Sequence, residues 1–229
     1  MTFINQTISI PREDCDAWAQ KAFYKISGLY RETPGKDKIK EMADLSLENI
    51  RYFVKPQAII TYFEKPTISG RRIQLGEEAL FCQALEQVKP NSVKAAFVYG
   101  LTLGELGEDS EEALLRLMVD FWGTAYVDAA RYKIREQIGA RGKEENLILS
   151  DELGPGFFGM GMSNVWKFSK LIDLSKIGIQ LGNKGMMFPE KSALGLFLLS
   201  EGEAITFEEK CLYCKGNEEG CKICMEETR

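Results

Sequence analysis

The sequence predicts an α+β fold with a largely antiparallel sheet flanked by helices. Helical patterns and short apolar runs follow one another irregularly, without the regular βαβ alternation that a parallel sheet requires. The runs at 58–63, 93–99 and 194–199 are rich in apolar residues and have the length of strands. A helical pattern over 111–138 continues for about seven turns, and its apolar stripe predicts packing against the sheet.

Helices are expected at four further places. Pro11 begins a helical pattern, and Gly28 stands where that helix would stop. Others are expected over 37–53, over 77–88 and, briefly, around 165–172. The positions expected to face the core are Cys15, Trp18, Ala19, Ala22 and Ile26 in the first helix, Ile39, Met42, Ala43, Leu47 and Ile50 in the second, and Leu114, Leu117, Met118, Phe121, Ala125, Ala129 and Tyr132 in the long one.

Turn residues and charges divide the rest of the chain. The run 68–75 is a candidate neighbour of the first strand, and plain turn chemistry is expected for 100–104, directly after the second. Charged residues at 141–145 predict a surface loop, which leads into a short strand at 146–150. Another short strand is expected at 177–181.

Composition limits the classes of function. A chain of 229 residues with 45% apolar content is long enough for one large domain, or for a domain with a small appendage. The net charge of −5 and the lack of a Lys and Arg cluster argue against nucleic-acid binding. Apolar runs stay far below the roughly 20 residues of a membrane span. The N-terminus has no signal-peptide pattern, so a cytoplasmic protein is expected.

The sequence contains no histidine. This excludes Ser-His and Cys-His nucleophile systems, zinc sites with histidine ligands and imidazole bases. Any chemistry would therefore depend on carboxylates, thiolates, Lys, Tyr or a bound cofactor.

Four of the six cysteines form a motif at the C-terminus. The spacing is Cys211-x2-Cys214-x6-Cys221-x2-Cys224, in which each C-x2-C can place two thiolates on one metal. The chain is expected to divide into a domain over 1–203 and a four-cysteine metal-binding tail over 204–229. Zinc and a [4Fe–4S] cluster are both compatible with four thiolates. Cys15 and Cys82 lie on apolar helix stripes and are expected in the core.

A glycine-rich stretch follows the strand at 146–150. Gly154, Gly156, Gly159 and Gly161 lie close together with Pro155, which predicts a backbone that approaches something closely. Three further blocks of sequence are distinctive. They are Thr102-Leu103-Gly104, Gly123 with Asp128 five positions on, and Met186-Met187-Phe188-Pro189-Glu190-Lys191-Ser192 followed by Gly195.

In combination, these segments resemble the activation (reactivation) domain of cobalamin-dependent methionine synthase, in particular its free-standing bacterial versions. The resemblance covers roughly residues 1–200. It implies a C-shaped α+β domain that binds S-adenosylmethionine in a shallow groove. It also implies a corrinoid carried on a partner protein or subunit, with a flavoprotein as reductant.

The resemblance implies an accessory subunit of a corrinoid-dependent methyltransferase system, which supports reductive methylation or reduction of the corrinoid. No catalytic side chain is expected in this chain, because the reactivity would reside in the cobalamin and the methyl donor. Two alternatives remain. One is a non-enzymatic binding module with a different small ligand, and the other is an iron–sulfur electron-transfer partner of a corrinoid protein.

The residues that the resemblance assigns to the ligand differ from the family pattern at several positions. Glu152 stands where the family has an arginine that pairs with the methionyl carboxylate, and Phe157 stands where it has a tyrosine. Repulsion by Glu152 predicts weaker binding of S-adenosylmethionine, unless Lys184 or Lys191 supplies the cation. The full set of candidate ligand contacts is Asp128, Glu152, Pro155, Gly156, Phe157, Lys191 and Phe197.

Overall fold

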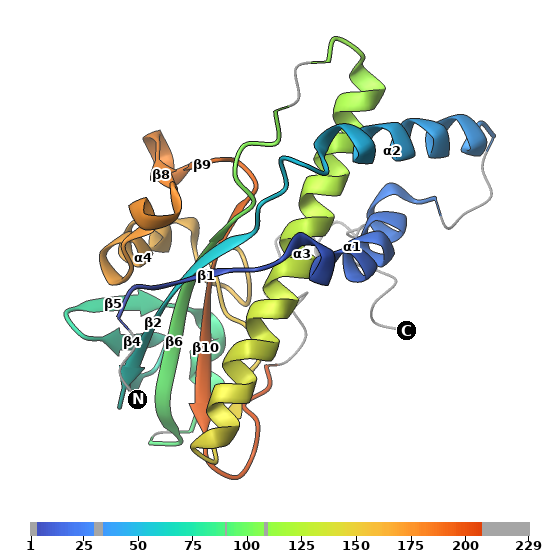
Figure 1. The fold of residues 1–229 in the computed structure, drawn as a ribbon. Helices are drawn as coiled ribbons and strands as arrows, with labels where there is room; N and C mark the ends of the chain where they lie inside the picture. Colours follow the sequence, from blue (N-terminus) through green and yellow to red (C-terminus); the bar gives the residue numbers. More distant parts are fainter. Residues whose placement is uncertain (1–3, 30–33, 90, 108–109, 208–229) are drawn as a thin grey trace.

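The computed structural model describes residues 4–29, 34–89, 91–107 and 110–207. The long helix α3 (Ala113–Glu144) runs along one face of a sheet, and α1 (Arg12–Ser27) and α2 (Lys36–Ile50) pack on that helix (Figure 1). The short helix α4 (Val165–Leu171) lies on the other face of the sheet. The predicted α+β class and the helices at both faces are confirmed.

An antiparallel sheet of five strands forms the centre of the fold. β6 (Val93–Thr102) is its middle strand and pairs with β2 (Gln57–Glu64) and with β10 (Ser192–Ser200). β1 (Gln6–Ser9) extends the sheet beyond β2, and β7 (Ile148–Leu149) extends it beyond β10. The three main predicted strands are therefore confirmed, and the structure shows that they lie side by side.

Side chains of β6 alternate between two hydrophobic cores. Phe97 and Tyr99 point into the core that the sheet shares with α1, α2 and α3. Ala96 and Val98 point into the core on the opposite face, which includes α4. Because both faces are covered, the strand is a continuous apolar run, which explains why the sequence pattern identified it.

The predicted apolar face of α3 is only partly correct. Leu117 is 45% exposed, whereas Trp122 and Tyr126, which were not assigned to the core, are almost fully buried. The sheet covers one side of α3 while α1 and α2 cover another, so a single stripe cannot describe the buried surface. Trp122 also stacks on Phe23 of α1, with ring centroids 3.8 Å apart.

The predicted face of α1 shows a similar difference. Cys15 and Ala19 are buried as expected, but Phe23 takes the place in the core that was expected for Trp18 and Ile26. Trp18 is 42% exposed and stacks on Tyr132 of α3. In α2 the structure buries Met42, Ala43 and Ile50, in agreement with the prediction, together with Ser46.

The helix predicted over 77–88 is wrong. β5 (Glu78–Phe81) pairs with β4 (Arg72–Leu75), and β4 pairs with β3 (Thr67–Ser69) to form a separate small sheet. Gly76 adopts a positive φ of 55° in the β4–β5 turn, a conformation that favours glycine. The run 68–75 is therefore a hairpin of its own and is not a neighbour of β2.

Other boundaries differ as well. The turn expected at 100–104 is wrong for residues 100–102, because β6 continues to Thr102. The loop expected at 141–145 is wrong because α3 continues to Glu144. The expected strand at 177–181 is reduced to β8 (Gln180–Leu181), which pairs with β9 (Met187–Phe188). The described residues also include short 3-10 helices, which are η1 (Gln83–Gln87), η2 (Met162–Asn164), η3 (Leu174–Ile177) and η4 (Asn183–Gly185).

None of the helices in the described residues combines the length and the apolar character needed to cross a bilayer.

Candidate functional site

The glycine-rich loop folds back onto the protein itself. Leu153 bridges to Leu196 of β10, and a Cβ on Gly154 would lie only 2.6 Å from the carbonyl oxygen of Leu194. A Cβ on Gly159 would lie 2.7 Å from the Gln83 side chain, and Gly159 has a positive φ of 75°. Gly154 and Gly159 are thus required by close packing, and the loop packs against β10 and Gln83.

A pocket of about 320 Å³ opens between this loop and helix α3. We call it the glycine-loop pocket. Its lining combines two arginines, two carboxylates and three aromatic rings. These residues are Arg131, Arg135, Asp151, Glu152, Phe157, Phe158 and Phe207.

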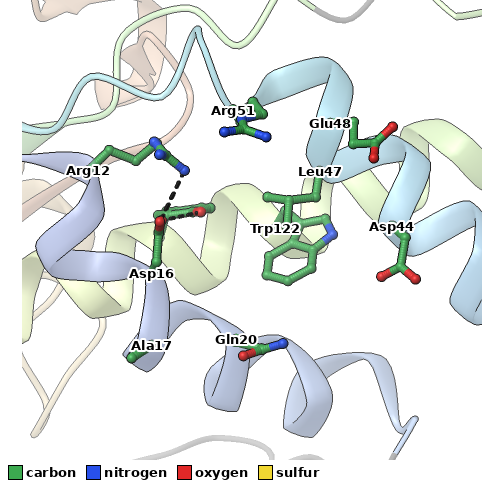
Figure 2. A pocket seen from close by; sticks show the side chains of 10 residues that line it. Arg12, Asp16, Ala17, Gln20, Asp44, Leu47, Glu48, Arg51 and Trp122 are labelled. Carbon is green, nitrogen blue, oxygen red and sulfur yellow. Dashed lines mark hydrogen bonds and ion pairs between the residues drawn. The ribbon is translucent and has the colours of Figure 1, made fainter.

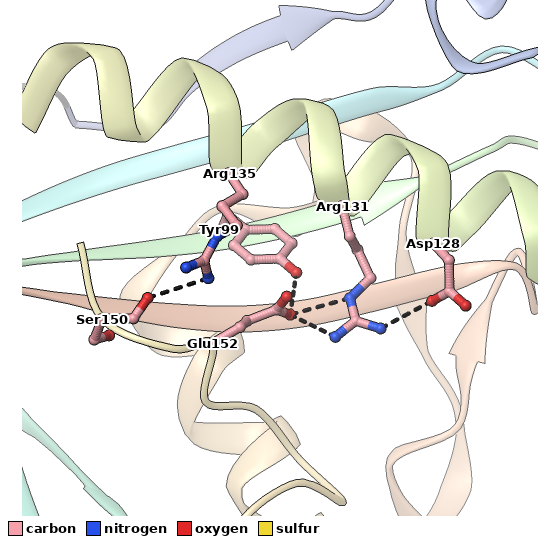
Figure 3. A network of polar contacts seen from close by, with 6 residues as sticks. All are labelled: Tyr99, Asp128, Arg131, Arg135, Ser150 and Glu152. Atoms are coloured by element: carbon pink, nitrogen blue, oxygen red, sulfur yellow. Dashed lines mark hydrogen bonds and ion pairs between the residues drawn. The ribbon is translucent and has the colours of Figure 1, made fainter. Parts of the chain in front are cut away.

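An ion pair between α3 and the loop forms one wall of the pocket. Arg131 donates from Nε and Nη2 to Oε1 of Glu152, at 3.1 and 2.9 Å, and from Nη1 to Asp128 at 3.0 Å (Figure 3). The hydroxyl of Tyr99 donates to the same Glu152 oxygen at 2.5 Å. The negative charge of Glu152 is therefore compensated within the protein, by a cation that the sequence alone did not pair with it.

The side chains of this pair are shielded from water, with 18% of Arg131 and 15% of Glu152 exposed. Burial, followed by the nearby charge of Glu152, raises the pKa of Tyr99 well above its usual range. Burial acts to lower the pKa of Arg131. The electrostatic interactions with Tyr99 and Glu152, together with the hydrogen bonds to Glu152, outweigh burial, so the pKa of Arg131 is raised. Tyr99 thus remains a neutral donor and Arg131 remains a cation.

Arg135 supplies a second positive charge to the pocket. It lies one helical turn after Arg131 and donates from Nη1 to the carbonyl of Ser150 at 3.2 Å (Figure 3). Its guanidinium carbon lies 5.7 Å from the ring centroid of Phe197. Within the part of the chain that the structure describes, no carboxylate forms an ion pair with Arg135. This side chain is accordingly the cation best placed to bind an anionic group of a ligand.

Aromatic rings provide the apolar surface of the pocket. The Arg131 guanidinium carbon lies 4.8 Å from the ring centroid of Phe157, a cation–π contact that fixes both groups. Phe158 and Phe207 are buried and pack together with centroids 5.3 Å apart. Flat apolar rings beside charged groups suit a ligand that has both an aromatic and a zwitterionic part.

The structure brings some of the candidate ligand residues together and separates others. Asp128, Glu152 and Phe157 all contact Arg131. Pro155 and Gly156 belong to the same loop as Phe157 but do not line the pocket. Phe197 is fully buried and stacks on Tyr99, with centroids 5.8 Å apart, so it does not line the pocket but packs behind the polar network.

Neither of the two lysines considered as substitutes for the family arginine lines the pocket. Lys191 is ion-paired with Asp120 at 2.6 Å and hydrogen-bonded to Thr124 at 3.1 Å. Its stem fills the space over Gly123, where a Cβ would lie 2.7 Å from Lys191 Cε. Lys184 is exposed on η4. The cations of the pocket come from α3 instead.

Tyr99, Arg131 and Arg135 were missed as site residues. In the sequence, Tyr99 looks like another apolar residue of a buried strand. Arg131 and Arg135 look like solvent-exposed residues of a helix. The one available signal was the spacing of Asp128, Arg131 and Arg135 at three and four residues, which places their side chains on one face of α3.

Another cavity, of about 530 Å³, is a cleft between α1 and α2 over α3 (Figure 2). Asp16 accepts hydrogen bonds from Arg12 and from the Tyr126 hydroxyl, and Trp122 donates to the Ala43 carbonyl, so several of its polar groups satisfy one another. None of the motif residues singled out in the sequence lines this cleft. Its lining is Arg12, Asp16, Ala17, Gln20, Asp44, Leu47, Glu48, Arg51, Trp122 and Tyr126.

The cysteines fall into two groups. Cys15 and Cys82 are buried, as predicted, and burial raises the pKa of both thiols to about 11. The proposed metal ligands Cys211, Cys214, Cys221 and Cys224 lie outside the described residues, as does all but the first four residues of the tail expected over 204–229. Among the residues that are described, no group of His, Cys, Asp or Glu is placed to hold a metal ion.

Fold and pocket together define an α+β domain with a pocket between its longest helix and a glycine-rich loop. The fold is similar to a solved structure, that of the MetH reactivation domain bound to AdoHcy, with a TM-score of 0.58. The similarity covers 98% of this chain and 88% of the other at 10% sequence identity. No protein-family model matches the sequence, and no curated protein does. The likeness is therefore one of fold, and it supports the fold expected from the sequence.

Proposed function

We propose that this protein is an accessory subunit of a cobalamin-dependent methyltransferase system, and that it binds an S-adenosyl ligand in the glycine-loop pocket. The observation that carries the proposal is the placement of Arg131 and Arg135 beside the loop to which the resemblance assigns the ligand. The neighbour in fold was solved with AdoHcy bound, which supports a ligand of this type.

The charges of the pocket explain how this ligand would be held without the family arginine. In this chain position 152 is a glutamate, and the cations beside the loop are supplied by α3. Arg135 would bind the carboxylate of the amino-acid part, and the carboxylates of Glu152 and Asp151 would face its ammonium group. Phe157 and Phe158 would pack against the nucleoside part. The chain supplies binding and orientation, and the methyl donor and the corrinoid would supply the reactivity.

Replacing Arg135 by glutamine is expected to weaken the binding of AdoHcy about tenfold or more, since a hydrogen bond to a charged group contributes about 1.5–3 kcal/mol. Isothermal titration of the full chain with AdoHcy and with S-adenosylmethionine measures the effect. Lys133→Gln is the matched control, because Lys133 lies on the same helix in an ion pair with Glu136 outside the pocket. Equal affinities of the two variants would contradict the assigned role of Arg135.

If AdoHcy and S-adenosylmethionine do not bind to the wild-type protein, the alternative of a non-enzymatic binding module with a different ligand is favoured.

The partnership with a corrinoid protein has its own test. Tagged full-length protein is expected to retain a cobalamin-carrying protein, recognisable by the visible spectrum of the corrinoid in the eluate. An eluate without corrinoid, from cells that contain cobalamin-dependent methyltransferases, would count against this part of the proposal.

A further inference from the structure

The cleft between α1 and α2 has a floor of aromatic rings whose polar atoms are already satisfied. Trp122 and Tyr126 of α3 form this floor and are almost fully buried. Trp122 stacks on Phe23 and donates its indole N–H to the Ala43 carbonyl at 2.9 Å. The Tyr126 hydroxyl donates to Asp16 at 2.8 Å. The two rings therefore offer the cleft an apolar surface in a fixed position.

One side of the cleft carries a positive charge that is not neutralised. Arg12 forms ion pairs with Glu13 and Asp16, at 3.0 and 3.1 Å. Arg51, at the end of α2, lies on the same side of the cleft (Figure 2). Within the described residues Arg51 forms no ion pair, and its guanidinium carbon lies 5.1 Å from the ring centroid of Tyr52. Arg51 can therefore bind an anionic group of a ligand.

The other side of the cleft carries negative charge. Asp44 and Glu48 line it from α2, and Gln20 faces the cleft from α1 (Figure 2). Neither carboxylate forms a hydrogen bond or an ion pair with any residue that the structure describes. Two such carboxylates at the edge of a concave site favour a cationic group of a ligand.

Helical geometry sets the distance between the two charged ends. Along the axis of α2, Glu48 lies about 4.5 Å and Asp44 about 10.5 Å from Arg51, so the middle of the acidic pair is about 7.5 Å away. Leu47 lies between these charges, above Trp122 (Figure 2). In extended free lysine, about 7–8 Å separates the carboxylate carbon from the side-chain nitrogen, and the stem between them is apolar.

We infer that this cleft binds a small molecule with a carboxylate at one end of an apolar stem and a cationic group at the other, such as a free basic amino acid. Its volume of about 530 Å³ lies in the range of small-molecule sites. The inference does not depend on the proposed function, because the cleft and the glycine-loop pocket share no lining residue. AdoHcy does not match the cleft, because its ammonium group lies next to its carboxylate.

Amide NMR titration of the full chain with L-lysine and with L-arginine tests the inference. Saturable shifts are expected for the indole N–H of Trp122 and for the amides of Gln20 and 44–51. Norleucine lacks the distal cation and cadaverine lacks the carboxylate, so each is expected to bind about tenfold more weakly than lysine, or weaker still. The inference would be overturned if neither basic amino acid gave saturable shifts in the cleft, or if norleucine or cadaverine bound as tightly as lysine.

Charge-removing variants test which side chains hold each end of the ligand. Arg51→Gln is expected to weaken lysine binding about tenfold and to remove the preference for lysine over cadaverine. Asp44→Asn/Glu48→Gln is expected to remove the preference for lysine over norleucine. All three side chains are exposed, so these changes are expected to leave the fold intact.

Lys40→Gln and Glu41→Gln are the matched controls, because both residues lie on α2 and neither lines the cleft. Both are expected to bind lysine as the unmodified protein does. Controls that weaken lysine binding as much as the cleft variants, or cleft variants that leave both preferences unchanged, would overturn the inference.

Discussion

Replacing Arg131 by methionine is expected to lower the free energy of unfolding by about 3–5 kcal/mol, because it leaves Glu152 as an uncompensated charge in a largely buried position. Tyr99 adds to the effect, since its hydroxyl is fixed to the same carboxylate oxygen. Urea unfolding followed by circular dichroism measures the loss. This is the largest effect that the structure predicts for a change in the pocket.

Two further variants show whether the loss comes from the buried pair. Lys133→Met removes a more exposed ion pair from the same helix and is expected to cost less than about 1 kcal/mol. Arg131→Met/Glu152→Met removes both charges and is expected to recover much of the stability that the single change loses. The account would be wrong if Arg131→Met were no more costly than Lys133→Met.

Gly195→Ala is expected to cost about 3 kcal/mol and to displace Tyr99. Gly195 lies opposite Tyr99 in the β6–β10 pairing, and a Cβ there would meet Tyr99 Cε1 without room for contact. Tyr99 is fully buried, so neither the ring nor the central strands can move without loss of packing. Unfolding measurements, together with the NMR signals of the Tyr99 ring, report both effects.

Gly202→Ala is the control for Gly195→Ala. Gly202 has a positive φ of 83° and nothing within 4 Å of the added Cβ, so only the backbone cost of about 1–2 kcal/mol applies. Combining Gly195→Ala with Tyr99→Leu is expected to restore part of the stability, because the smaller side chain leaves room for the methyl group. Equal losses for Gly195→Ala and Gly202→Ala would show that the ring contact does not govern the requirement for glycine.

Periodicity was sufficient for the central elements of the fold. β6 and β10 are buried on both faces, so their continuous apolar runs identified them directly. The pattern of α3 identified a long helix but not its buried face, because contacts with α1, α2 and the sheet decide which side chains are covered. The small three-stranded sheet at 67–81 was mistaken in part for a helix, because short apolar runs fit either period.

The candidate site was predictable only as a loop. The glycine-rich stretch was recognised, and the structure places a pocket beside it. Glu152 alone predicted repulsion of an anionic ligand, whereas the structure pairs it with Arg131, 21 residues earlier, and with Tyr99, 53 residues earlier. The effect of a charge depends on the partners that tertiary structure brings to it, and no local pattern contains them. The requirement for Gly195 likewise became explicable only through the Tyr99 ring.

The most direct test of the central claim is an amide NMR titration of the full chain with AdoHcy. If the glycine-loop pocket is the binding site, the largest chemical-shift changes will fall on 151–158 and on Arg131 and Arg135, with saturation at equimolar ligand. Residues that line the cleft between α1 and α2, such as Gln20 and Glu48, will change little. The absence of shifts at saturating ligand, or shifts centred on that cleft, would contradict the account.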